Sequence, residues 1–486
     1  MKNFLIFVLL IAAASSASAE QISYSDSDGP HGISMLRSGS NSISINFSLS
    51  DWSIDNTEVG QTQMQSINST GIMLPNDAGS PNLPGWSKWI AIPNGATASA
   101  RIISSRSEVV ENIDVAPAGR IPREDEDGLP EPVPNQAIYN NNALYPVSPV
   151  IVSETKTVRG VQMVLIGISP FQFNPVTKEL VVNRDMEIEV SFFGGDGEFG
   201  QQRLRSRWWD PIIKNMVINP GALPVVEYTV PTGSRTEDFE YLIIVPDSPL
   251  FVAWGDSIAN FRNQQGIRTG VKTIAEVGGN MSTAIESYID NAYNTWDVPP
   301  SGILLIGDYA TGGGLGIISP TWDSYCTSDN FYADVDEDGL PEIAISRITA
   351  NDQLQLETTI NKILDYERNP PTEYSFYNEP VMAGGWQRER WFVLCEEVVY
   401  GFLANELGKS PTREYAIYSG ATDIWSSATN TSAVTNYFGP SGLGYIPATP
   451  AHLTDWGANA TRINNDINNG TFMVQHRDHG DVTGWG

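Results

Sequence analysis

The chain has 486 residues, a length that accommodates about two to four domains of ordinary size. Its 57 acidic and 28 basic residues give a formal charge of −29, which argues against a nucleic-acid-binding protein because phosphate contacts need basic side chains. The two cysteines, Cys326 and Cys395, are too few for a disulfide framework, and the sequence leaves open one bridge or two free thiols.

The first 19 residues have the pattern of a secretory signal. Lys2 provides a basic start, Phe4–Ala14 is apolar, and the small residues Ala17–Ala19 form a cleavage site before Glu20. The apolar stretch is too short for an ordinary membrane-spanning helix, and no later segment reaches about 18 apolar residues. We therefore expect cleavage after Ala19 and a secreted or cell-surface protein without a membrane span in its mature form.

Residues 20–231 have the pattern of an all-β, sandwich-like domain. The segments Ser42–Ser48 and Met186–Phe192 alternate with period two, and Val161–Gly167 is a short apolar run. Turn residues separate these segments, and no long segment with helical periodicity occurs. Residues 121–141, rich in proline and acidic side chains, are expected to form an extended loop.

From residue 232 onward, strands alternate with helices, which predicts an α/β fold with a mostly parallel sheet. We divide this part into a first subdomain, 232–375, and a second, 376–486. Ligands of such sheets bind at the carboxyl ends of strands, where Asp308 and His479 are expected. The predicted strands are Tyr241–Val245, Arg268–Thr273, Gly302–Asp308, Val381–Ala383 and Phe472–Gln475, and the predicted helices are Phe251–Gln265, Ser282–Ala292, Asp352–Tyr366, Trp391–Leu407 and Ala458–Asn468.

His479 and Gly480 follow the last predicted strand and form a candidate catalytic turn. An imidazole titrates near neutrality and can therefore accept the proton of a thiol, which yields the nucleophilic thiolate. Glycine after the histidine allows the turn to approach a substrate backbone closely. His476, on the strand itself, is the alternative base.

An acidic loop is the second candidate site. Asp334, Asp336 and Asp338 alternate along the chain, followed by Gly339 and, three residues later, Glu342. Alternating carboxylates before a glycine are typical of loops that wrap Ca²⁺ with oxygen ligands. The loop is not an EF-hand, because Ile345 occupies the twelfth position and no helices flank it. A solvated acidic turn is the alternative.

The part from about Phe239 to Gly486 resembles the catalytic domain of the gingipain family of secreted, caspase-like bacterial cysteine peptidases. The segments Gly79–Pro84 and Ile92–Ala96 resemble the β-rich inhibitory propeptide of the same family. In the catalytic part the matching segments are, in chain order, Tyr241–Val245, Asn263–Val271, Leu304–Asp308, Ser328–Tyr332, Glu342–Arg347, Tyr366–Arg368 and His479–Gly480.

The resemblance implies an endopeptidase that acts on proteins or peptides through a Cys-His pair, with its own propeptide as inhibitor and no organic cofactor. It makes His479 the base and places the nucleophilic cysteine after it, so we expect that cysteine beyond Gly486 and this fragment to be inactive. It also implies structural calcium, with Asp308 and Glu342 matching family ligands.

Three further assignments follow from the resemblance. Glu396 and Glu397 fall near the position of an acid that binds a basic substrate side chain. The family's third catalytic acid should follow Gly384–Gly385, where no acid stands at the direct match and Glu389 is the nearest. Cleavage of the propeptide is expected at Arg235, because Arg203, Arg205 and Arg207 precede Trp208–Trp209, which looks like buried packing.

Two other interpretations remain open. The chain could be a catalytically inactive, calcium-stabilised binding or adhesion protein on the same fold. The weaker alternative is a metallohydrolase that uses Asp308 and the acidic loop, although zinc sites usually contain more than one histidine.

Overall fold

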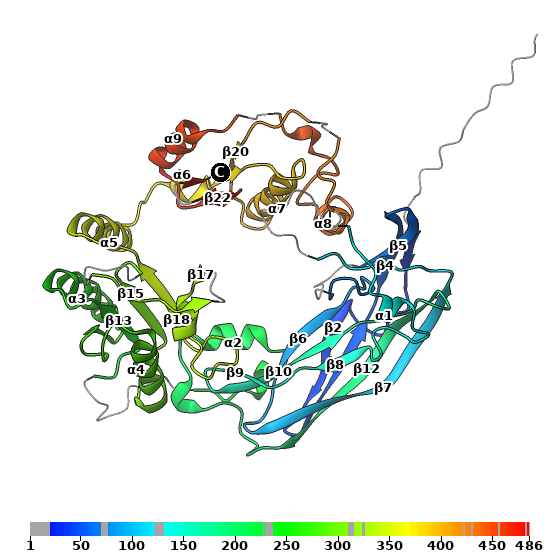
Figure 1. The fold of residues 1–486 in the computed structure, drawn as a ribbon, viewed down its shortest axis with the longest axis horizontal. Coiled ribbons are helices and arrows are strands. Elements are labelled where there is room, and N and C mark those ends of the chain that lie inside the picture. Colours follow the sequence, from blue (N-terminus) through cyan, green and yellow to red (C-terminus); the bar gives the residue numbers. More distant parts are fainter. Residues whose placement is uncertain are drawn as a thin grey trace, which may run out of the picture.

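The computed structural model describes residues 20–69, 76–120, 131–226, 228, 237–309, 315–322, 326–420, 423–428, 431–454, 457–481 and 484–485. The predicted signal, including Ala19, lies outside these residues, as do Arg235 and the expected domain boundary at residue 231. Figure 1 shows three parts in chain order: a β-rich part in blue to cyan, a first α/β part in green, and a second in yellow to red. Among the described residues, no helix is long and apolar enough to cross a membrane.

The β-rich part, which we call the prodomain after its resemblance to the gingipain propeptide, consists of antiparallel sheets around one core. One sheet has the order β1-β4-β5, a second β6-β10-β8 with β9 also on β10, and a third β11-β12-β3-β2 with β7 also on β12. Their bounds are β1 Glu20–Ser23, β2 Gly32–Ser38, β3 Ser42–Ser48, β4 Asp51–Val59, β5 Thr62–Asn68, β6 Trp86–Ala91, β7 Ala96–Glu111, β8 Val150–Val152, β9 Lys156–Val158, β10 Val161–Ile168, β11 Phe171–Asn174 and β12 Glu179–Gly194.

The period-two pattern explains how this core forms. In β3 the side chains of Ile43, Ile45 and Phe47 are buried, and β12 pairs with it so that Ile188 lies opposite Ile45. Alternate side chains of one strand share a face, so each of these strands presents one apolar face to the core. The predicted strands at residues 42–48, 161–167 and 186–192 are all found. Short helices complete this part: α1 Gln136–Tyr139, η1 Gln202–Leu204, α2 Asp210–Met216 and η2 Pro220–Ala222.

The first α/β part is a four-stranded parallel sheet of order β14-β13-β15-β18 with helices on both faces. In β13, Leu242 and Ile244 pack toward the core that contains α4, whereas Ile243 and Val245 pack toward α3 and α5. Burial on both faces accounts for the continuous apolar run of this strand. The bounds are β13 Tyr241–Val245, α3 Pro249–Gln264, β14 Thr269–Thr273, α4 Ser282–Thr295, β15 Gly302–Ile306, β16 Thr321–Trp322, β17 Cys326–Thr327, η3 Asp329–Tyr332, β18 Ala344–Ile348, α5 Gln353–Arg368 and α6 Tyr374–Asn378.

The second α/β part has its own parallel sheet, of order β20-β19-β21. The described strands therefore form two separate parallel sheets, one in each predicted subdomain. Strand β20 has no signal in the sequence, because its residues, Thr-Arg-Glu-Tyr, include two charged side chains and form no apolar run. The bounds are β19 Val381–Gly384, α7 Trp391–Asn405, β20 Thr412–Tyr415, α8 Thr431–Phe438, η4 Pro450–His452, α9 Ala460–Gly470, β21 Val474–Arg477, β22 Gly480–Asp481 and β23 Gly484–Trp485.

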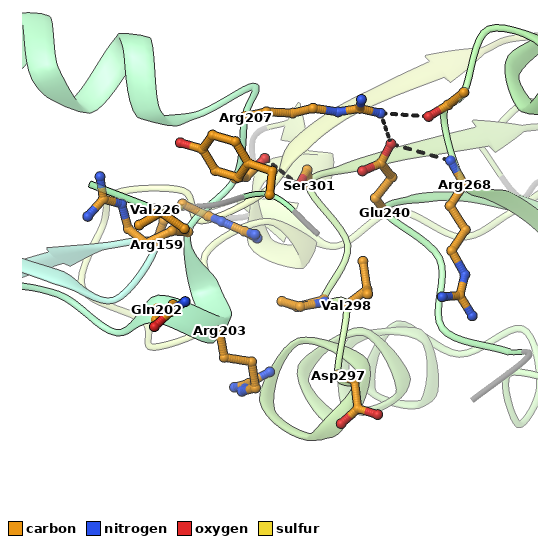
Figure 2. A pocket seen from close by; sticks show the side chains of 15 residues that line it. Arg159, Gln202, Arg203, Arg207, Val226, Glu240, Arg268, Asp297, Val298 and Ser301 are labelled. Atoms are coloured by element: carbon orange, nitrogen blue, oxygen red, sulfur yellow. Dashed lines mark hydrogen bonds and ion pairs between the residues drawn. The ribbon is translucent and has the colours of Figure 1, made fainter. Parts of the chain in front are cut away.

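Arginine side chains of the prodomain join it to the first α/β part. Arg203 donates hydrogen bonds to the carbonyl oxygens of Tyr293 (2.8 Å) and Trp296 (2.9 Å) at the end of α4. Arg207 donates to the carboxylate of Glu240 and to the Gly266 carbonyl (2.7 Å), as Figure 2 shows. Residues of both parts line a pocket of about 560 Å³ at this junction.

One buried ion pair underlies this junction. The Arg205 guanidinium binds both carboxylate oxygens of Asp210 at 2.6 Å, and the two side chains are 0% and 3% exposed. Removing one partner of such a pair leaves an unpaired charge in the interior. The pair therefore fixes the start of α2 against the chain segment that leads into the junction.

We expect Asp210→Asn to destabilise the prodomain by about 3–5 kcal/mol, because Arg205 would keep its buried charge without a counter-ion. The matched control is Glu189→Gln, which removes the half-buried partner of Arg101, a side chain that is 73% exposed, and should cost less than about 1 kcal/mol. Urea unfolding of both variants measures the difference. Equal losses in the two variants would contradict the assignment.

Candidate active site

The parallel pairing of β21 with β19 positions the candidate catalytic histidine. In the register, Gly384 at the carboxyl end of β19 lies opposite Arg477 at the carboxyl end of β21. His479 follows two residues later, and Gly480 begins β22, which pairs with β23 in antiparallel orientation. His479 thus lies at the carboxyl edge of a parallel sheet, the edge at which α/β proteins bind ligands. His476 lies within β21 opposite Ala383, and burial lowers its pKa.

Two side chains from neighbouring segments hold the His479 ring. The Gln387 amide nitrogen lies 3.3 Å from His479 Nε2, and the ring of Phe392 meets the imidazole edge to face with centroids 5.3 Å apart. Gln387 follows β19, and Phe392 belongs to the first turn of α7. The imidazole is therefore positioned by the loop after one strand and by the helix that follows it.

Gly385 is required by the close approach of the loop that carries His479. A Cβ atom at this position would lie 1.7 Å from Oδ2 of Asp478, well inside contact distance. The Gly385 amide donates to the Arg477 carbonyl (3.0 Å), and the His479 amide donates to Oδ1 of Asp478 (2.7 Å). The second glycine of the Gly-Gly pair thus leaves room for the aspartate that braces the histidine turn.

The residue beside the histidine is an amide, which the sequence analysis did not single out. Glu389, the acid considered there, accepts a hydrogen bond from the Ser427 amide (2.7 Å). Gln387 stands two residues after Gly385, so the Gly-Gly pair marks its neighbourhood in the sequence, although the resemblance led us to expect an acid there. An amide can position an imidazole by hydrogen bonding without changing the net charge of the site.

Glu396 and Glu397, expected near a substrate pocket, are both 1% exposed on the inner side of α7. Glu397 accepts hydrogen bonds from Arg413 (2.6 and 2.9 Å) and Tyr415 (2.6 Å), and lies 3.0 Å from His452 Nε2. Burial alone would raise the pKa of Glu397, but these hydrogen bonds hold it below the usual value. This burial counts against a role in binding a basic substrate side chain.

Glu396 has the opposite environment although it is the next residue. Its Oε2 atom has no hydrogen-bond partner in the described part of the chain, and burial raises the pKa of the carboxyl group to about 8. A carboxyl group in such surroundings holds its proton at neutral pH. The structure therefore makes Glu396 a buried, neutral acid rather than an exposed charge.

Both cysteines are free thiols in different surroundings, so the single bridge left open by the sequence is not formed. Cys326 is exposed on β17, and Cys395 is half-buried on α7. Burial raises the pKa of the Cys395 thiol, which disfavours the thiolate that a nucleophile needs.

The acidic loop brings three of its predicted ligands together. Asp334, Asp336 and Asp338 each place a carboxylate oxygen within 4.8 Å of the others. The amides of Asp338 (3.0 Å) and Gly339 (2.9 Å) donate to the Asp334 carboxylate, and Gly339 has a φ of 91°, which favours glycine. The carboxylate of Asp334, the first aspartate of the loop, therefore stabilises the turn by accepting hydrogen bonds from two of its amides.

Neither Glu342 nor Asp308 belongs to the set of three carboxylates that meet within 4.8 Å of one another. Glu342 is 2% exposed, accepts a hydrogen bond from the Val335 amide (2.8 Å) through Oε2, and has no partner for Oε1 among the described residues. Burial and the neighbouring aspartates raise its pKa to about 8. Asp308 instead accepts from its neighbour Tyr309 (2.8 Å) and from Asn351 (3.0 Å) at the end of β15. The three aspartates, together with the buried and unpaired Oε1 atom of Glu342, are the kind of oxygen ligands that a hard cation such as Ca²⁺ prefers.

The fold and the site define a two-part protein: a β-rich prodomain and an α/β domain with a histidine at the edge of its sheet. The family model "Peptidase family C25" matches residues 234–486, and "Propeptide_C25" matches residues 23–204. The chain belongs to peptidase family C25, which confirms the resemblance to the gingipains.

Relatives and one solved structure give the extent of the similarity. "Gingipain R1" of Porphyromonas gingivalis is 24% identical over 445 residues, which cover 88% of this chain and 39% of that protein. "Lys-gingipain" of the same organism is 25% identical over 362 residues, covering 70% of this chain and 20% of that protein. The solved complex of RgpB pro- and mature domains is 20% identical with a TM-score of 0.36, covering 39% of this chain and 97% of that one. The chain thus spans well under half the length of these two relatives.

The raised pKa of Glu396 predicts a pH-dependent stability. Between its usual value of 4.5 and about 8, the folded state keeps a proton that the unfolded chain releases, so stability falls as pH rises through this window. In Glu396→Gln the free energy of unfolding should no longer fall over this pH window. By pH 8 the variant should therefore be more stable than the natural protein by a few kcal/mol. Thermal unfolding at pH 5 and pH 8 measures it.

Glu397→Gln is the matched control and should behave in the opposite way. It removes the partner of Arg413 and destabilises the protein at neutral pH, with a smaller loss at low pH, because the natural carboxylate becomes protonated there. Similar pH profiles for the two variants would contradict the different environments assigned to the two side chains.

Proposed function

We propose that the chain is the precursor of a secreted cysteine endopeptidase in which His479 is the general base. The observation that carries this proposal is the placement of His479 at the carboxyl edge of the β20-β19-β21 sheet, held by Gln387 and Phe392. Membership of family C25 supports the reaction class. We further propose that the nucleophile is a cysteine beyond residue 486, because the Cys395 thiol has a raised pKa and Cys326 lies in the first subdomain.

The chemistry follows from the contacts of the imidazole. The Gln387 amide can turn its carbonyl oxygen toward His479, accept the Nε2 hydrogen, and leave the Nδ1 lone pair to take the thiol proton. Cysteine peptidases can use an amide as the third member of their catalytic group, because that member mainly orients the imidazole. Gln387 is therefore assigned as a positioning residue, and Gly480 as the residue that keeps the turn open to substrate.

The prodomain contacts support latency of the precursor. Besides the arginine contacts, the Trp209 indole donates to the Ser301 carbonyl (3.0 Å), and the Ser301 hydroxyl donates to that of Ser206 (2.7 Å). We propose that this interface keeps the propeptide bound as an inhibitor until cleavage, at Arg235, separates the parts. The substrates would be proteins or peptides outside the cell.

One observation favours a second candidate function, an inactive binding or adhesion protein on the same fold. The side chain found beside His479 is an amide, and Glu389 is engaged by the Ser427 amide instead. A protein that lost catalysis would tolerate such a change, so the experiment must separate the two functions.

The test uses the full-length gene product, matured, with a fluorogenic peptide library and a thiol reagent. We expect thiol-dependent hydrolysis that falls by at least about 100-fold in His479→Ala, the scale of general-base catalysis. His476→Ala should retain activity, which distinguishes the two histidines. Gln387→Ala should lower kcat and shift the acid limb of the pH profile of kcat/KM, and Gln387→Glu should restore much of kcat.

Thermal unfolding of each variant provides the folding control. Undiminished hydrolysis in a folded His479→Ala variant would refute the assignment of the base. Absence of thiol-dependent hydrolysis in the folded, matured natural protein would refute the peptidase function and favour the binding protein.

We also propose that the acidic loop binds Ca²⁺ as a structural ion. Asp334, Asp336, Asp338 and Glu342 would supply oxygen ligands, and the ion would neutralise four carboxyl groups that repel one another. Asp308, which the resemblance made a ligand, lies outside the group of three aspartates and is left as a candidate for a separate position.

Calcium should therefore raise the thermal stability of the first α/β part, and chelation should lower it. At a concentration about 100 times Kd, binding adds about 2.7 kcal/mol to the free energy of unfolding. Calorimetry with Ca²⁺ and with chelator should show this response in the natural protein and lose it in Asp336→Asn. Asp365→Asn, on the exposed face of α5, is the control that should retain it. A response that persists in Asp336→Asn would place the ion elsewhere.

A further inference from the structure

A strand of the prodomain, β9, donates hydrogen bonds directly to the acidic loop. Lys156, at the start of β9, donates a hydrogen bond from Nζ to the backbone carbonyl oxygen of Asp338. The next residue, Thr157, donates its backbone amide to Oδ2 of Asp338 at 2.6 Å. Leu340, two residues farther along the loop, packs against the prodomain core. The loop proposed to bind a cation is thus also a contact surface of the propeptide.

The atoms taken by the prodomain are of the kind that a hard cation uses. Carboxylate and backbone carbonyl oxygens are the usual ligands of Ca²⁺ in such loops. The ammonium group of Lys156 therefore binds an oxygen of Asp338, a residue whose carboxylate belongs to the acidic group. Among the described residues, no ion pair involves Asp334, Asp336, Asp338 or Glu342, so their mutual repulsion is not relieved by a salt bridge.

The electrostatic state of the loop agrees with this view. The carboxylate oxygens of Asp334, Asp336 and Asp338 lie within 4.8 Å of one another, and like charges at such distances repel. A nearby positive charge lowers the free energy of such a cluster. Lys156 supplies one positive charge at the edge of the loop, whereas Ca²⁺ would supply two at its centre, and the two cations repel each other.

We propose that Lys156 and a divalent cation compete for the acidic loop, so that calcium binding loosens the hold of the propeptide. This inference rests on the calcium site proposed above. Competition is reciprocal: the factor by which the docked prodomain weakens calcium binding equals the factor by which calcium weakens docking. The propeptide would then hold the loop most firmly where calcium is scarce and less firmly in a calcium-rich medium outside the cell.

The rest of the interface sets the limit of the effect. The contacts of Arg203, Arg207 and Trp209 lie at α4, Glu240 and Ser301, and none of them involves the acidic loop. Calcium would weaken the contacts between β9 and the acidic loop and leave the other contacts of the prodomain in place. The prodomain is therefore weakened by calcium rather than released by it, and cleavage of the chain is still needed for separation.

The test is a calcium titration by calorimetry of the intact chain, with Ca²⁺ alone as the probe. Lys156→Met should bind Ca²⁺ on the order of tenfold more tightly than the natural chain, a coupling within the usual range. Lys178→Met is the matched control, because Lys178 pairs with Asp114 inside the prodomain and should leave the affinity unchanged. Hydrogen exchange adds a second readout: saturating Ca²⁺ should speed exchange of the Thr157 amide in the natural chain.

The outcomes separate the two proposals. Equal calcium affinity in the natural chain and Lys156→Met, or unchanged protection of the Thr157 amide at saturating Ca²⁺, would overturn the competition and leave the calcium site intact. Binding in neither protein at millimolar Ca²⁺ would refute the site and the competition together. Binding seen in Lys156→Met alone would be the strongest support.

Discussion

The parallel pairing of β21 with β19 is the constraint on which the candidate active site depends. It places the chain after Arg477 against the chain after Gly384, so that the histidine turn and the Gly-Gly loop meet at one edge of the sheet. The contact is possible because residue 385 has no side chain and Asp478 fills the space. The contacts of His479 with Gln387 and with Phe392 in the first turn of α7 depend on that register. A slip of one residue would turn the strand's side chains to the other face.

The acidic loop shows the same dependence on a neighbouring element, but through charge. Three aspartates and Glu342 are drawn together by backbone amides of the loop itself, and the resulting repulsion is left without an ion pair among the described residues. Such an arrangement is costly unless a cation shares the loop. Lys156 of the prodomain and a bound metal ion are two ways to supply that charge. In the competition that we propose, the loop would link the stability of the first α/β part to the docked prodomain.

Much of the fold could be predicted from periodicity. The apolar run of β13 and the period-two pattern of β3 each report the burial of the strand directly, so their bounds agree with the structure. β20 could not be predicted in this way, because its two charged residues are satisfied by tertiary partners: Arg413 by Glu397, and Glu414 by Arg462. Its place in the sheet is set by its pairing with β19, and this pairing cannot be predicted from the residues of β20 alone.

The adjacent residues Glu396 and Glu397 show why site residues are harder to predict than elements. In the sequence they are two equivalent acids within one predicted helix. In the structure the side chains are buried to the same degree. Arg413, Tyr415 and His452 approach only the second, so its charge is stabilised while the first is left protonated. Those partners come from β20 and η4, segments whose positions depend on the whole subdomain. The same reasoning applies to Gln387: the Gly-Gly pair marks its neighbourhood in the sequence, but its contact with His479 depends on the sheet that brings the two together. The chemistry of this protein is therefore set by which groups the fold brings together, and residue type alone only narrows the candidates.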